Sequence, residues 1–149
     1  MRNYRVTEKT TPDGKSILCG SEDEEQQMVI EWASYMSIRY PELQLLYHVP
    51  NGGSRNRVEA SKLKRMGVKA GVPDLVLPVP RGGYAGLYIE LKVGKNKPTE
   101  NQERWLERLM QQGYRTKVCY GSVEAERELE WYLSQETTVM LTKEEHEKG

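Results

Sequence analysis

Val72-Pro73-Asp74-Leu75-Val76-Leu77-Pro78-Val79 and Leu87-Tyr88-Ile89-Glu90-Leu91-Lys92 are the two segments that decide the fold of this chain. Both are rich in apolar residues and bounded by proline and glycine, which predicts strands over 72–79 and 87–92. Because the turn between them is short, the strands are expected to pair antiparallel. The start of the first strand then lies beside the end of the second, so Asp74, Glu90 and Lys92 converge at one end of the sheet.

Glu90 and Lys92 are two residues apart and share one face of their strand. Two carboxylates beside a lysine are typical of a site for a hard cation, since Mg²⁺ takes one or two carboxylates and fills its other positions with water and phosphate. The carbonyl of Leu91 is a further candidate ligand, and the lysine can orient a water or stabilise charge on phosphorus. On an edge strand the same residues would be an ordinary ion pair, but their apolar neighbours favour interior strands.

On either side of these strands, capping boxes at Ser21 and Thr99 predict helices over 21–40 and 99–113. Further strands are predicted over 44–49 and 115–120, a basic helix over 57–66, and a last helix, capped by Ser122, over 122–134. This order predicts one α/β domain, residues 21–134, with a central mixed β-sheet flanked by helices. Residues 1–20 are expected to form an arm or hairpin with a turn at Pro12-Asp13-Gly14, and residues 135–149 a frayed, charged C-terminal tail.

The charge of the chain is unevenly distributed. The 149 residues include 22 Lys and Arg and 22 Asp and Glu, so the net charge is zero. Residues 51–97 hold ten basic and three acidic residues, a net charge of +7, and the rest of the chain sums to −7. Such a basic block is a candidate contact surface for a phosphate backbone, or else a solvated helix face.

Several classes of protein are excluded. No run of apolar residues approaches the roughly 18 that a membrane span needs, and the N-terminus has no secretory apolar region. Cys19 and Cys119 match no zinc or redox spacing, which favours free thiols in a cytoplasmic protein.

The motifs resemble a known family. Pro73-Asp74 followed by Glu90-Leu91-Lys92 resembles the signature of the PD-(D/E)xK nuclease superfamily, whose restriction-endonuclease-like core has the element order predicted above. The chain from about Ser21 to Tyr132 is more narrowly similar to the VRR-NUC domain, especially its small stand-alone, phage-type members. The segments that carry this similarity are Glu22-x-x-x-Gln26, His48-Val49-Pro50-Asn51-Gly52-Gly53, Gly67-Val68-Lys69-Ala70-Gly71-Val72-Pro73-Asp74, and Thr99-x-x-Gln102 with Trp105.

The resemblance implies a Mg²⁺- or Mn²⁺-dependent DNA endonuclease. Asp74 and Glu90 would hold the metal, Lys92 would position the attacking water or stabilise the transition state, and Gln102 would orient the site. An acid at the start of the first helix would complete the metal site. Glu22 is favoured because it lies on the face that continues into Val29, and Glu25 is the alternative.

DNA contacts are expected from the basic block and the loops beside the proposed site. The residues expected to make them are Asn51, Arg55, Arg57, Lys62, Lys69, Lys95 and Lys97.

The resemblance also implies a homodimer acting on branched DNA such as Holliday junctions, in the cytoplasm of the host cell if the chain is phage-encoded. Symmetric cutting of a four-way junction needs two sites related by a two-fold axis. Two alternatives use the same residues differently: a non-catalytic DNA-binding or assembly module on a nuclease-like fold, and a hydrolase of a small phosphate ester. Two acids converging beside phosphate disfavour the first, and the wide basic block disfavours the second.

Overall fold

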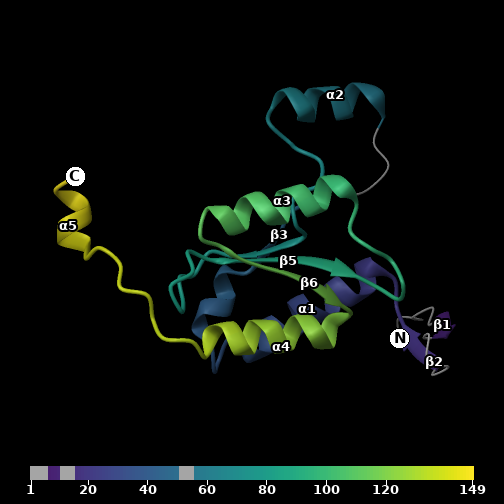
Figure 1. Ribbon diagram of the computed structural model, residues 1–149, viewed down its shortest axis with the longest axis horizontal. Helices are drawn as coiled ribbons and strands as arrows, with labels where there is room; N and C mark the ends of the chain where they lie inside the picture. Colours follow the sequence, from purple (N-terminus) through teal and green to yellow (C-terminus); the bar gives the residue numbers. More distant parts are fainter. Residues whose placement is uncertain (1–6, 11–15, 51–55) are drawn as a thin grey trace.

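The structure, a computed structural model, describes residues 7–10, 16–50 and 56–149 (Figure 1). An N-terminal hairpin of β1 (Thr7–Thr10) and β2 (Ser16–Cys19) precedes the main body, and its predicted turn at residues 12–14 lies outside the described residues. The remaining elements are α1 (Glu22–Met36), η1 (Pro41–Leu45), β3 (Tyr47–His48), α2 (Arg57–Arg65), β4 (Leu75–Leu77), β5 (Leu87–Lys92), α3 (Glu100–Gln111), β6 (Arg115–Tyr120), α4 (Ser122–Leu133) and α5 (Lys143–Glu147).

A four-stranded mixed sheet with the order β3-β4-β5-β6 forms the centre of the molecule. β4 pairs antiparallel with β3 and with β5, and β5 pairs parallel with β6. The α/β class and the antiparallel pairing of the two deciding strands are therefore confirmed. Leu75 lies opposite Ile89. One residue further along the same register, Asp74 lies beside Glu90.

Helices cover both faces of this sheet, with α3 on one side and α1 and α4 on the other (Figure 1). The inward-facing residues Leu75, Leu77, Ile89 and Leu91 pack with residues of α1 and α4 in one buried cluster. Removing this apolar surface from water provides the main stabilisation and holds the ends of β4 and β5 rigidly.

The segment before β3 differs from the prediction. α1 ends at Met36 rather than near Tyr40, because residues 37–39 form a turn in which the N–H groups of Arg39 and Tyr40 both donate to the Met36 carbonyl. Residues 41–45 then form a 3₁₀ turn that buries Leu43, so the strand predicted over 44–49 shrinks to two residues. β4 is likewise shorter than the predicted 72–79, since Pro73 has no N–H to pair.

Two elements stand away from the body (Figure 1). α2 has no buried residue and extends beyond α3. The C-terminal tail was predicted to be frayed, but it contains the short helix α5, which begins with a capping box formed by Thr142 and Glu145. In the part of the chain that the structure describes, no helix is both long and apolar enough to span a membrane.

Candidate active site

Asp74 is fixed by its backbone and its side chain at the end of β4. The N–H of Val49 donates to its carbonyl oxygen at 2.8 Å, and Nδ1 of His48 lies 3.0 Å from the same oxygen. Its Oδ2 accepts a hydrogen bond from the N–H of Leu91 at 2.8 Å. Burial raises the pKa of this carboxyl, while the Leu91 hydrogen bond and the Lys92 charge oppose the rise. The side chain is therefore held against the end of strand β5.

Glu90 is a carboxylate in the interior of the protein, with a relative exposure of 1%. Lys92 Nζ lies 2.9 Å from its Oε1, and its Oε2 has no hydrogen-bond partner among the described residues. Burial, followed by the negative charge of Asp74, raises the pKa of Glu90 to about 7. An unpartnered buried carboxylate oxygen is costly unless a cation or donor joins it.

Lys92 projects between the acids of the site. Burial disfavours its charge, but the ion pair with Glu90 outweighs burial and leaves the pKa of Lys92 raised. Glu22 Oε1 is 3.9 Å from its Nζ. Its carbonyl oxygen accepts a hydrogen bond from the N–H of Gly121 at 2.9 Å, which ties the end of β5 to the start of α4. The ammonium therefore remains charged and fixed near neutral pH.

The structure separates the two candidate acids of the first helix. Glu22 faces the site, 3.9 Å from Lys92 Nζ and 3.4 Å from Asn96 Nδ2. Glu25 turns away: its Oε2 accepts from the N–H of Ser122 at 2.6 Å and its Oε1 from the N–H of Gly20 at 3.2 Å. The prediction that Ser122 caps the last helix is wrong, because Gly121 occupies the N-cap and the Glu25 carboxylate satisfies the helix N-terminus instead.

The carbonyl of Leu91 points toward the site. In a strand, the N–H and C=O of one residue face the same side. Since the N–H of Leu91 donates to Asp74, its carbonyl faces the Asp74 side of β5, whereas the carbonyl of Lys92 faces β6 and binds Gly121. Two carboxylates and one carbonyl oxygen therefore border the same space.

These residues fit a hard cation. The described residues include no cluster of three or more His, Cys, Asp and Glu side chains placed to hold a metal. Mg²⁺ does not require one, because it binds through one or two carboxylates and keeps several waters. The unpartnered Oε2 of Glu90 and the Oδ1 side of Asp74 are hard oxygen donors of the type Mg²⁺ and Mn²⁺ prefer.

Gln102 lies at the start of α3 and its side chain binds the backbone there. Its Oε1 accepts a hydrogen bond from the N–H of Thr99 at 2.8 Å and completes the capping box that begins α3. Two other α3 residues reach the loop before Asp74: Asn101 Nδ2 and Trp105 Nε1 donate to the carbonyl of Ala70 at 2.9 and 3.0 Å. α3 therefore fastens the loop that carries Asp74.

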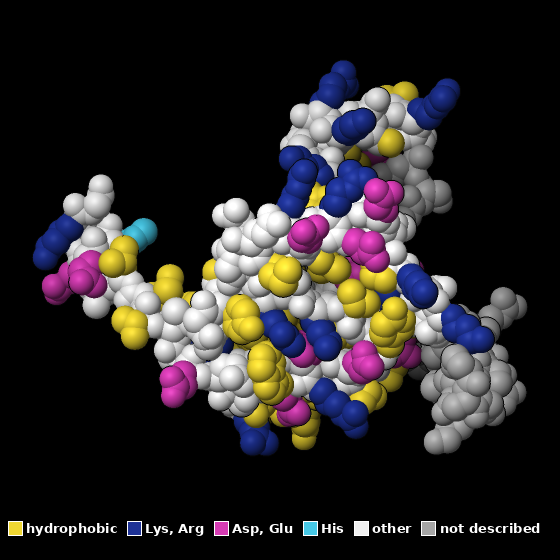
Figure 2. Space-filling view, in the orientation of Figure 1, with side chains coloured by type: hydrophobic (Ala, Val, Ile, Leu, Met, Phe, Trp, Pro, Cys, Tyr) yellow, Lys and Arg dark blue, Asp and Glu magenta, His cyan; other side chains and the backbone are white. Residues whose placement is uncertain are grey.

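The predicted DNA contacts fall into three groups. Arg57 and Lys62 are exposed on α2, and Figure 2 shows Lys and Arg side chains gathered on this helix. Lys69 is exposed in the loop before Asp74, and Lys95 and Lys97 are exposed in the loop after Lys92. Asn51 and Arg55 lie outside the described residues.

Sequence reasoning missed the contacts made by Asn96, Asn101 and Glu25. His48 lies in a segment that carries the family resemblance, but its contact with the Asp74 carbonyl had no signal in the sequence. Asn101 had none either, since it acts on the Ala70 carbonyl, 31 residues away. The signal for Glu25 was the absence of a capping side chain at Gly121, which left the N-terminus of α4 without a local partner.

Comparisons with known proteins agree with this fold. The family model of the VRR-NUC domain matches residues 20–123. A solved structure described as a VRR_NUC domain protein is 33% identical, with a TM-score of 0.70 over 81% of this chain and 94% of that chain. No curated protein matches the chain. The fold is therefore a restriction-endonuclease-like core, and the chain belongs to the VRR-NUC domain family, a nuclease-type family.

Proposed function

We propose that this chain is a divalent-metal-dependent DNA endonuclease that hydrolyses phosphodiester bonds. The observation that carries the proposal is the buried Glu90 carboxylate, which has one oxygen beside Lys92 and the other without a hydrogen-bond partner in the described chain. A buried and a half-buried carboxylate side by side, both with raised pKa values, at the end of a rigid sheet are typical of a functional site.

Asp74, Glu90 and the carbonyl of Leu91 would hold Mg²⁺ or Mn²⁺, and Glu22 would complete the site directly or through water. When bound, the metal supplies a Lewis acid for the phosphate and lowers the pKa of a bound water. The Leu91 N–H and His48 keep Asp74 in place, so little rearrangement is needed when a substrate arrives.

Lys92 would position the attacking water or stabilise the negative charge that develops on phosphorus. Its ammonium lies within reach of both Glu90 and Glu22, and its pKa is raised, so it acts as a cation rather than as a base. Gln102 would orient the site indirectly, because its capping box fixes the start of the helix that holds the Ala70 carbonyl.

DNA would lie across the exposed lysines and arginines on both sides of the carboxylates. Arg57, Lys62 and Lys69 are on the α2 side, and Lys95 and Lys97 are on the loop after β5. Asn51 and Arg55 belong to the same proposed contact surface. We further propose that the protein acts as a homodimer on branched DNA such as Holliday junctions, with two sites related by a two-fold axis.

The test is cleavage of linear duplex, flap and four-way-junction DNA, side by side, with Mg²⁺, with Mn²⁺ and with EDTA. The proposal predicts cuts only with metal and faster cutting of branched than of linear DNA. Absence of cleavage on all three substrates with either metal, by folded protein that still binds DNA, would favour the non-catalytic alternative. Light scattering at micromolar concentration tests the dimer, and a monomeric mass contradicts it.

A further inference from the structure

A cavity of about 570 Å³ lies between α2 and the start of α3. Ala60, Leu63 and Val68 supply apolar walls, and Lys64 and Lys69 supply two cations at its lining. Neither lysine forms an ion pair within the described residues, and no acidic residue lines the cavity. The volume lies within the range of about 300–1,000 Å³ that holds small organic ligands.

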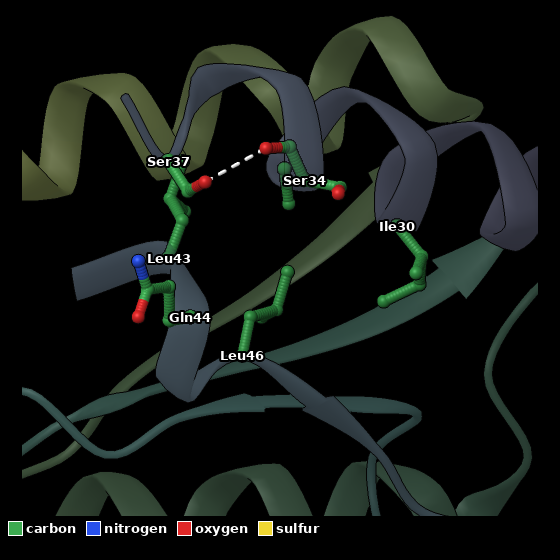
Figure 3. Close-up of a pocket in the computed structure, with 7 residues that line it drawn as sticks. Ile30, Ser34, Ser37, Leu43, Gln44 and Leu46 are labelled. Carbon is green, nitrogen blue, oxygen red and sulfur yellow. Dashed lines mark hydrogen bonds between the residues drawn. The ribbon is translucent and has the colours of Figure 1, made fainter. Parts of the chain in front are cut away.

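Two other cavities of the molecule differ from this one in chemistry. The cavity between α1 and η1, about 300 Å³, is lined by apolar and neutral polar side chains, and the Ser37 hydroxyl there donates to the Ser34 carbonyl (Figure 3). The groove over β6 and α4, about 520 Å³, contains Glu124 and Glu128 beside its cations. The cavity under α2 thus combines apolar walls with uncompensated positive charge.

The cavity is tied to the proposed catalytic residues through one loop. Its lining ends at Ala70, whose carbonyl is held by Asn101 and Trp105. Gly71 follows with a φ of 87°, and a Cβ there would lie 2.6 Å from Asn101 Nδ2. Lys69 is five residues before Asp74, a span of at most about 18 Å. The cavity therefore lies within a few nucleotides of the proposed site of cutting.

We infer that this cavity holds one unpaired nucleotide of the DNA substrate, with its base against Ala60, Leu63 and Val68 and its flanking phosphates near Lys64 and Lys69. The inference rests on the proposed function and adds an unpaired nucleotide to the DNA features that the protein selects. A paired base is stacked within the duplex and cannot present its face to these walls. An already unpaired base enters without the cost of breaking a pair, which is a source of selectivity.

The experiment measures binding of fluorescent DNA in EDTA, so that no cleavage occurs. A duplex with a one-nucleotide bulge is compared with the fully paired duplex. Wild type should bind the bulged duplex more tightly. Ala60→Phe, which fills the cavity, should weaken binding of bulged DNA about tenfold and leave binding of paired DNA nearly unchanged. The matched control is Val58→Phe, because Val58 lies on the same helix, is 79% exposed and does not line the cavity; it should keep the preference.

A second pair of variants separates the cavity from general electrostatics. Lys64→Ala should reduce the preference for bulged DNA, whereas Lys62→Ala should weaken both duplexes equally, because Lys62 lies on the same helix outside the cavity. A wild-type protein without preference for the bulge, or equal effects of Ala60→Phe on both duplexes, would overturn the inference. Cleavage with Mg²⁺ is measured separately. Cleavage without a preference for the bulge would contradict only the proposed role of the cavity. A preference for the bulge without cleavage would contradict only the proposed catalysis.

Discussion

Glu90 is the residue at which stability and the proposed activity conflict. The period-two pattern of β5 predicted that Glu90 and Lys92 share a face, and they do. The pattern could not show that both faces of β5 are covered, because alternation specifies which residues lie together and says nothing about what packs over them. Covering this face leaves Glu90 1% exposed and raises its pKa to about 7.

Glu90 should therefore make metal-free stability depend on pH. Its folded pKa, about 7, lies above its ordinary value of 4.5, so the folded protein holds a proton that the unfolded chain releases between these values. The contribution of Glu90 to the free energy of unfolding therefore falls as pH rises from 4.5 to about 7, and it stays low at higher pH. Relative to wild type, Glu90→Gln should gain about 1–3 kcal/mol of unfolding free energy between pH 5 and pH 8. Urea denaturation in EDTA measures this; an equal difference at both pH values would contradict it.

Glu25 is predicted to be a structural residue rather than a metal ligand. Glu25→Ala removes the acceptor for the N–H groups of Ser122 and Gly20 and should lower the free energy of unfolding by about 1–2 kcal/mol. Glu25→Gln keeps one carbonyl acceptor in place of two carboxylate oxygens and should recover only part of this loss. Asp23→Ala is the control, since Asp23 is an exposed acid in the same helical turn. Equal losses in urea denaturation for Asp23→Ala and Glu25→Ala would refute the role.

At the scale of elements, the strands and helices around the site were predictable because their signals are local. The capping boxes at Ser21 and Thr99 begin α1 and α3 as expected, and β5 and β6 have the predicted bounds. The failures occur where tertiary contacts decide. The 3₁₀ turn at 41–45 forms because Leu43 enters the core, and α4 is capped by Glu25, which is 97 residues away from Ser122.

The loop before β4 should be sensitive to a single methyl group. Gly71 and Gly83 both have φ near +85°, so alanine at either position costs about 1–2 kcal/mol of backbone strain. At Gly83 the new Cβ meets nothing within 4 Å, whereas at Gly71 it would lie 2.6 Å from Asn101 Nδ2 and 3.0 Å from Trp105. Gly71→Ala should therefore lower the melting temperature more than Gly83→Ala, because it also displaces the donors to Ala70. Equal melting temperatures for the two variants would contradict this, because they would show that the loop before β4 accommodates the extra Cβ.

At the scale of the whole molecule, the net charge of zero conceals a division between elements. The +7 block includes α2, which has no buried residue and carries much of the positive charge visible at one end of the molecule (Figure 2). Acidic and basic side chains mix on the face over α3 and α4 in the same view. The proposed DNA-contact surface therefore centres on this protruding helix and on the loops beside the carboxylates.

Neutralising α2 should reduce the salt dependence of DNA binding. In the triple variant Lys62→Ala, Lys64→Ala, Arg65→Ala, the slope of log affinity against log salt should become shallower by about 2–3, since each lost phosphate contact contributes about 0.9. Replacing Lys143 and Lys148 at the C-terminal helix should leave the slope unchanged. Binding titrations from low to moderate salt measure both; an unchanged slope in the triple variant would remove α2 from the DNA contact surface.

Single-turnover cleavage of one DNA substrate with saturating Mg²⁺ tests whether Asp74, Glu90 and Lys92 form a metal-dependent nuclease site. The site variants are Asp74→Asn, Glu90→Gln and Lys92→Ala. The control is Glu128→Gln, because Glu128 is a buried carboxylate on α4 that pairs with Arg115 at 2.7 Å. We expect each site variant to lose at least about a hundredfold in rate and Glu128→Gln to cleave at a rate close to wild type. Cleavage by folded Asp74→Asn at the wild-type rate would contradict it.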